Sequence, residues 1–220
     1  MISYEINITE INNGPDLFFK KENISYAFTT TSKQNDYFQN DLITAIKLGD
    51  CEIELKKHYD IPLNDNLYIL KIDVPLDGMK IPKIEYEVYY PIYKNNLTKL
   101  NLSICQDIKI DISIPIDISK EDLDKNNASS GFYYDLCYTL TSEKGTDKVL
   151  SDRQNDFVEK NMTVCEENCE FTNYDDDQKK AICSCYVKLK LPIISEVKID
   201  TNQLYSNFKD IKNIGNFKMM

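Results

Sequence analysis

Cysteine is the residue type with the clearest chemical potential in this 220-residue chain, which contains seven of them. Thiols pair as disulfides in oxidising compartments, whereas thiolates hold zinc. Four cysteines lie close together, as C-x3-C at Cys165 and Cys169 and as C-x-C at Cys183 and Cys185. Structural zinc sites usually contain two C-x2–4-C pairs, and C-x-C departs from that spacing. The pattern favours a disulfide framework; the alternatives are a zinc site, which would make the chain a cytosolic zinc-stabilised scaffold, and buried free thiols.

The other three cysteines are spread along the chain, at Cys51, Cys105 and Cys137. A bridge between Cys51 and Cys105 is one possibility, but spacing alone does not decide connectivity. All seven residues are therefore disulfide candidates. Because seven is odd, one thiol has no partner within the chain or pairs with another molecule.

A second chemical signal is the N-glycosylation sequon Asn-x-Ser/Thr, in which x is not Pro. With 21 Asn and 25 Ser or Thr in 220 residues, about two sequons are expected by chance. The chain has six, at Asn7, Asn23, Asn96, Asn101, Asn127 and Asn161. This excess favours passage through the secretory pathway, where a surface asparagine receives a bulky glycan.

Residues for catalysis are few. The single histidine, His58, lies in an expected helix and is interpreted as a surface residue, and six glycines leave little for a phosphate-binding loop. We expect no enzyme activity and no cofactor or metal.

The acidic pairs at 52/54, 85/87 and 166/167 are interpreted as solvated faces, although a carboxylate pair acting on carbohydrate is an alternative. The run 175–177 is interpreted as an acidic turn rather than a Ca²⁺ site, and the tyrosines near 86–93 as core residues rather than a sugar-binding stripe.

Composition narrows the class of protein. Lys and Arg total 26 against 36 Asp and Glu, so the formal net charge is −10 and the pI is near 4.7. This balance argues against sequence-independent nucleic-acid binding and against a basic membrane-binding surface. No run approaches the roughly 18 apolar residues that span a bilayer. With 42% hydrophobic residues, the chain is rich enough in apolar side chains to fold.

Alternation of apolar and polar residues predicts strands in the first half of the chain. From 109 to 118 every even position is Ile, a period of two that places the isoleucines on one face of a strand. Similar alternation predicts strands at 2–8, 68–74, 84–92 and 100–104. A hairpin is expected at 170–187, around the turn at 175–178. The fold class is therefore mainly β (α+β): an antiparallel sheet or sandwich, followed by a small disulfide-rich hairpin module with short helices.

Helices are expected at 50–59, 119–125 and 151–160, the last from the capping-box spacing of Ser151 to Gln154. The polar run 124–131 is the best boundary between units. We expect a β-rich sheet domain at 1–126, a cysteine-rich hairpin module at 127–194 and a C-terminal tail at 195–220.

Several runs together resemble cysteine-rich ectodomain segments of large predicted surface proteins from AT-rich, protist-like genomes. The resemblance extends from Leu42 to the C-terminus and is carried by the runs 48–52, 81–89, 136–138, 145–147, 151–153, 165–169 and 183–185. It implies an extracellular or lumenal module whose membrane anchor lies outside this chain, in a longer protein. We expect a protein or glycan ligand, which the sequence does not identify.

The hairpin ending in C-x-C also resembles the second half of an EGF-like module. That resemblance implies a bridge from Cys165 to Cys183 and one from Cys169 to an earlier cysteine such as Cys137. It leaves Cys185 without a partner, because no cysteine follows it. The first residues lack the basic and apolar regions of a signal peptide. We therefore expect a fragment of a longer chain, and a non-enzymatic role in structure, adhesion or ligand binding.

Overall fold

The chain forms two antiparallel sheets with few short helices, which confirms the expected mainly β (α+β) class. The computed structural model describes residues 16–21, 23–40, 43–75, 81–93, 96–127, 129–141, 145–160, 164–166, 168–193, 202 and 205–206. The strand expected at 2–8 lies outside these residues.

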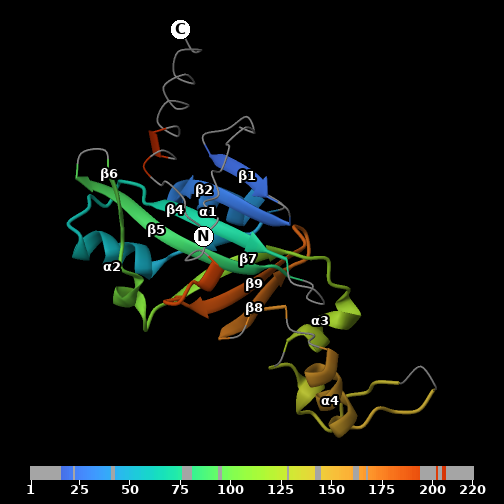
Figure 1. The fold of residues 1–220 in the computed structure, drawn as a ribbon. Coiled ribbons are helices and arrows are strands. Elements are labelled where there is room, and N and C mark those ends of the chain that lie inside the picture. Colours follow the sequence, from blue (N-terminus) through green and yellow to red (C-terminus); the bar gives the residue numbers. More distant parts are fainter. Residues whose placement is uncertain are drawn as a thin grey trace.

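Sheet A has five strands and sheet B has four (Figure 1). The order in sheet A is β1 (Leu17–Lys21), β2 (Ile24–Thr30), β4 (Tyr68–Val74), β5 (Lys83–Tyr93) and β6 (Asn96–Lys99). The order in sheet B is β3 (Ala45–Lys47), β7 (Lys109–Pro115), β9 (Lys180–Tyr186) and β8 (Cys169–Asp175). Every strand pair in both sheets is antiparallel.

The main core lies between the two sheets. The period-two pattern of β7 buries Ile110, Ile112 and Ile114 there, as expected. They pack in one cluster with Ile84, Tyr86 and Val88 of β5 and with the inward-facing cysteines of β9. This contiguous cluster makes the two sheets a sandwich.

Sheet A also buries apolar side chains on its opposite face. A second cluster there includes Tyr26, Phe28, Leu70, Ile72 and Tyr89. Two residues from the C-terminal part of the chain, Leu191 and Tyr205, pack against them. Because both faces of sheet A are covered, β5 carries buried side chains at even and odd positions, including Glu85 and Glu87. The interpretation of this acidic pair as a solvated face is therefore wrong.

Three helices follow the sequence signals. They are α2 (Asp50–His58), α3 (Lys120–Asn126), whose N-cap Ser119 accepts from the Asp122 N–H, and α4 (Leu150–Lys160). Ser151 lies inside α4 rather than capping it. The polar helix α1 (Thr31–Asn40) was not expected, and residues 102–105 form the 3-10 helix η1 (Leu102–Cys105) in place of a strand.

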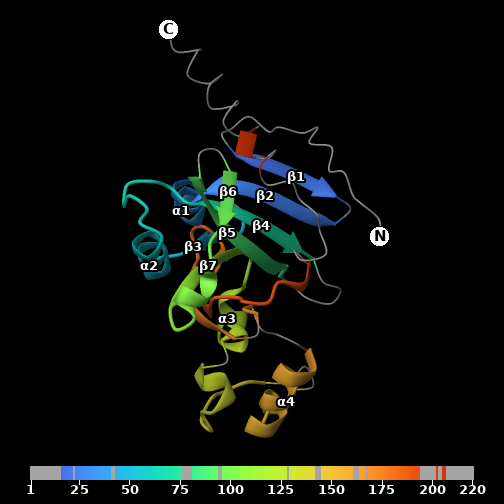
Figure 2. The ribbon, with the colours of Figure 1, turned by 60° about the vertical axis from the view of Figure 1, so that its left-hand side comes forward.

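Figures 1 and 2 both show α3 and α4 beyond one end of the sandwich, with the 3-10 helix η2 (Gly131–Tyr133) between them in the sequence. The hairpin β8–β9 is not part of this region, because β9 pairs with β7 along its length. The pairing crosses the expected boundary at 126/127, so the hairpin shares its sheet and core with the first half of the chain. No helix among the described residues is long and apolar enough to cross a membrane.

Candidate functional site

A disulfide joins Cys51 to Cys105, 54 residues apart. Cys51 lies in α2 and Cys105 ends η1, and both are fully buried in the main core. Their Cα atoms are 5.4 Å apart, an ordinary separation for a disulfide. The bond ties α2 to the segment that leads into β7.

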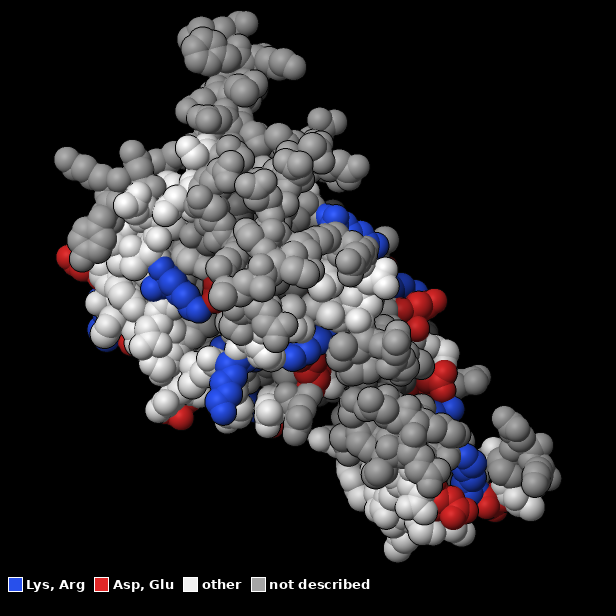
Figure 3. Space-filling view, in the orientation of Figure 1, with Lys and Arg blue, Asp and Glu red and all other residues white. Residues whose placement is uncertain are grey.

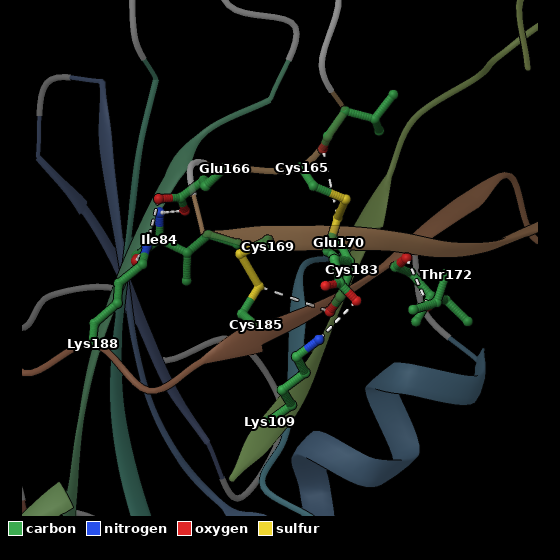
Figure 4. The surroundings of a disulfide bond; sticks show 12 residues. Ile84, Lys109, Cys165, Glu166, Cys169, Glu170, Thr172, Cys183, Cys185 and Lys188 are labelled. Carbon is green, nitrogen blue, oxygen red and sulfur yellow. Dashed lines mark hydrogen bonds and ion pairs between the residues drawn. A yellow bond between two sulfur atoms is a disulfide. The ribbon is translucent and has the colours of Figure 1, made fainter. Parts of the chain in front are cut away.

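Two more disulfides attach the β8–β9 hairpin, Cys165 to Cys183 and Cys169 to Cys185 (Figure 4). Cys183 and Cys185 are two positions apart on β9, so both point into the core. Cys169 lies directly opposite Cys185 in the register of β8 and β9. Both cysteines of the C-x3-C segment are therefore bonded to the two cysteines of the C-x-C segment, which lie on the single strand β9.

This pairing corrects the one implied by the EGF-like resemblance. The bridge from Cys165 to Cys183 is confirmed, but Cys169 does not pair with Cys137, and Cys185 has a partner. Cross-strand register places Cys169 beside Cys185. Cys137 lies instead in the segment between η2 and α4, where it is exposed and free. Cys137 is thus the unpaired member of the seven, and its candidacy for an intrachain disulfide is wrong.

The zinc-scaffold alternative loses its ligands in this arrangement, because all four proposed thiols are bonded to sulfur. Among the residues that the structure describes, no three His, Cys, Asp or Glu side chains are grouped to hold a metal ion. The acidic run 175–177 forms the hairpin turn: Asp175 accepts from the Gln178 N–H and Asp176 pairs with Lys179.

Glu166 and Lys188 flank the hairpin and close around the backbone of Ile84 in β5 (Figure 4). The Ile84 N–H donates to Glu166 Oε1 at 2.7 Å, and the Ile84 carbonyl accepts from Lys188 Nζ. The same ammonium pairs with Glu166 Oε2. Because Ile84 lies beyond the part of β5 that pairs with β6, the two side chains take the place of a neighbouring strand. The sequence interpretation of Glu166 as part of a solvated face missed this role.

Four of the six sequon asparagines lie in the described residues, and three of these four are exposed. Asn23, Asn96 and Asn101 are exposed, Asn127 is half-buried, and Asn7 and Asn161 lie outside the described residues. Two of them share a local geometry: Asn101 Oδ1 accepts from the Ser103 N–H and Asn127 Oδ1 accepts from the Ser129 N–H, both at 3.0 Å. In each case the side-chain oxygen closes a turn across the sequon.

The remaining chemical candidates are placed as follows. His58 is exposed at the end of α2 and contacts the ring of Tyr59 edge to face. Tyr86 and Tyr89 are buried on opposite faces of sheet A, which confirms the prediction of core packing for these two, whereas Tyr90 is half-buried. Burial raises the pKa of both phenols. On the described part of the face in Figure 3, lysines and carboxylates are interspersed.

Comparisons with protein-family models, with curated proteins and with solved structures found no match for this chain.

Proposed function

We propose that this chain is a non-enzymatic, N-glycosylated and disulfide-stabilised module of an extracellular or lumenal protein, with a role in structure, adhesion or ligand binding. The observation that carries the proposal is that six of the seven cysteines form three disulfides within the folded chain. Such bonds persist in oxidising compartments and are rare in the cytosol.

Two further features support this assignment. At least three sequons present an exposed asparagine, which a glycan needs in the folded protein. The cysteine pattern also resembles the ectodomain segments of large surface proteins, which supports placement in a longer, membrane-anchored chain. The partner would then be a protein or a glycan outside the cell.

The test is a thiol count on the protein isolated from its native cells, with alkylation of free thiols at lysis. Under denaturing, non-reducing conditions we expect one alkylated cysteine, Cys137, and disulfide-linked peptides for the other six. The same sample after reduction should yield seven alkylated cysteines and serves as the control. A count of six or seven thiols before reduction would contradict the proposal, because the protein would then reside in a reducing compartment.

A further inference from the structure

The outermost strand of sheet A, β6, is bracketed by two sequons. Asn96 is its first residue, and Asn101 follows its last residue by two positions. A strand at the edge of a sheet presents backbone N–H and C=O groups to which another chain can add. β6 is also only four residues long, so its ends lie about 10 Å apart. Asn96 and Asn101 therefore lie at or just beyond the two ends of this short edge.

Each of these sequons places an exposed asparagine before a buried leucine, although Leu97 packs in the second cluster and Leu102 in the main core. In each, the middle residue is a buried leucine, Leu97 at 9% and Leu102 at 7% exposure. The flanking asparagines are exposed. At Asn101 the side-chain oxygen bonds to the Ser103 N–H, so the amide nitrogen, which is the atom that carries an N-glycan, takes no part in that turn.

At two places on sheet A, side chains form hydrogen bonds with backbone groups that point away from the neighbouring strand. Glu166 and Lys188 bind both backbone groups of Ile84 on β5. On β6 the Leu97 N–H donates to Asn202 Oδ1 at 3.0 Å. The protein therefore covers open backbone at the edge with side chains, and the sequons lie where β6 begins and just beyond its end. A third exposed sequon, Asn23, lies in the turn beside β1, the other edge strand of sheet A.

We propose that N-glycans on Asn96 and Asn101 cover the edge of β6 and prevent a strand of a second copy of this chain from adding to sheet A. The inference rests on the proposed function, because it needs the glycosylation chemistry of the secretory pathway. In that step Asn Nδ2 attacks C1 of the first sugar of a lipid-diphosphate-linked oligosaccharide. The new N–C bond replaces the bond to the diphosphate, which leaves with its lipid, and the amide loses one proton.

The experiment uses the full chain, secreted from a eukaryotic host, in wild-type form and as the variant Asn96→Gln/Asn101→Gln. Because Asn101 also caps η1, the variant Thr98→Ala/Ser103→Ala is made in parallel, since it abolishes both sequons but keeps both asparagines. Asn127→Gln removes a glycan from the α3 region, away from the sheet edge, and is the matched control. Site occupancy is read by peptide mass spectrometry, and self-association by sedimentation velocity.

We expect the glycosylated wild type and Asn127→Gln to sediment as monomers. Both double variants, and wild type treated with an N-glycan-releasing enzyme, should shift to associated species with rising concentration. If all three glycan-free forms stay monomeric, the edge-covering role is wrong even though the glycans exist. If Asn23 and Asn127 carry glycans but Asn96 and Asn101 do not, this inference fails and the proposed function stands. If no site is occupied in protein from native cells and its thiols are free, both fail.

Discussion

Glu166 and Lys188 form an ion pair that closes on both backbone hydrogen-bonding groups of Ile84. The two residues flank the disulfide-bonded hairpin of sheet B, whereas Ile84 belongs to sheet A. The contact therefore ties the two layers of the sandwich at a place where β5 pairs with β4 on one side but lies beyond the part that pairs with β6 on the other. Charged groups that satisfy backbone groups in this way contribute more to stability than exposed ion pairs.

Glu166→Gln should destabilise the fold by about 1 to 3 kcal/mol. The substitution leaves Lys188, whose side chain is only 18% exposed, without its charged partner. Urea unfolding at neutral pH measures the change. Glu170→Gln is the matched control, because Glu170 pairs with Lys109 at a largely exposed site and should change stability by less than about 1 kcal/mol. Equal effects of the two variants would contradict the role assigned to Glu166.

The disulfides should differ in their contributions. Cys51→Ala/Cys105→Ala opens a loop of 54 residues and is expected to cost about 4 kcal/mol, whereas Cys169→Ala/Cys185→Ala opens one of 16 residues and costs about 3 kcal/mol. Urea unfolding under non-reducing conditions gives both values. Cys137→Ala should leave stability unchanged, because that side chain is exposed and unbonded. A loss of stability in Cys137→Ala would show that Cys137 has a structural bond.

Stability should fall as the pH rises above 10. Burial raises the pKa of Tyr86, Tyr89 and Tyr68 above that of an unfolded tyrosine, so above pH 10 the unfolded chain releases protons that the folded chain keeps. Each fully shifted phenol then costs about 1.4 kcal/mol per pH unit. Lys71 acts oppositely. Burial lowers its pKa, so the buried ammonium destabilises the folded state at low pH, and this penalty disappears as the pH rises to the ordinary lysine pKa of 10.5. One lysine against three tyrosines leaves a net loss.

Tyr86→Phe isolates the contribution of one phenol. Its unfolding free energy, measured between pH 8 and 11, should fall less steeply above pH 10 than that of the wild type, by the amount assigned to one phenol. Tyr186→Phe removes an exposed phenol and serves as the comparison. An unchanged alkaline slope in Tyr86→Phe would mean that Tyr86 ionises in the folded protein.

Local patterns in the sequence were sufficient for β4, β5, β7, the β8–β9 hairpin and three helices, but they did not predict β1, β2, β3 or β6. The alternation at Ile110, Ile112 and Ile114 predicted β7 because one face of that strand is buried, whereas the other is half-buried except at the buried Ser113. The same rule misplaced Glu85 and Glu87, because their face is covered by residues about 100 positions later, such as Leu191 and Tyr205. Long-range coverage of this kind leaves no periodic signal.

The cysteines show the same limit. Spacing favoured disulfides over zinc, but the choice of Cys185 over Cys137 as partner for Cys169 depends on strand register, which spacing does not contain. The residues around Ile84 were missed for a related reason. Glu166 lies 82 positions from Ile84. Because the next residue is also a glutamate, the sequence alone favours a solvent-exposed position for Glu166.

Arg153, the only arginine of the chain, should be the residue on which the α3–α4 region depends most. Its side chain is 1% exposed, and its guanidinium lies 5.7 Å from the ring centroid of Phe132 and 5.3 Å from that of Tyr138. It also donates to the Asp135 carbonyl at 2.8 Å. Arg153→Lys keeps the charge but loses the planar group that stacks on both rings and reaches the backbone carbonyl.

We expect Arg153→Lys to loosen residues 129–160 and to leave the sandwich intact, because the contacts of Arg153 lie within that region. Hydrogen exchange should show faster exchange in α4 and in the segment around Tyr138, with β5, β7 and β9 unchanged. Lys148→Arg, a change of the same two residue types at a half-buried position of this region, is the control. Faster exchange throughout the sheets would show instead that Arg153 stabilises the whole molecule, and unchanged exchange everywhere would show that the stacked guanidinium contributes little.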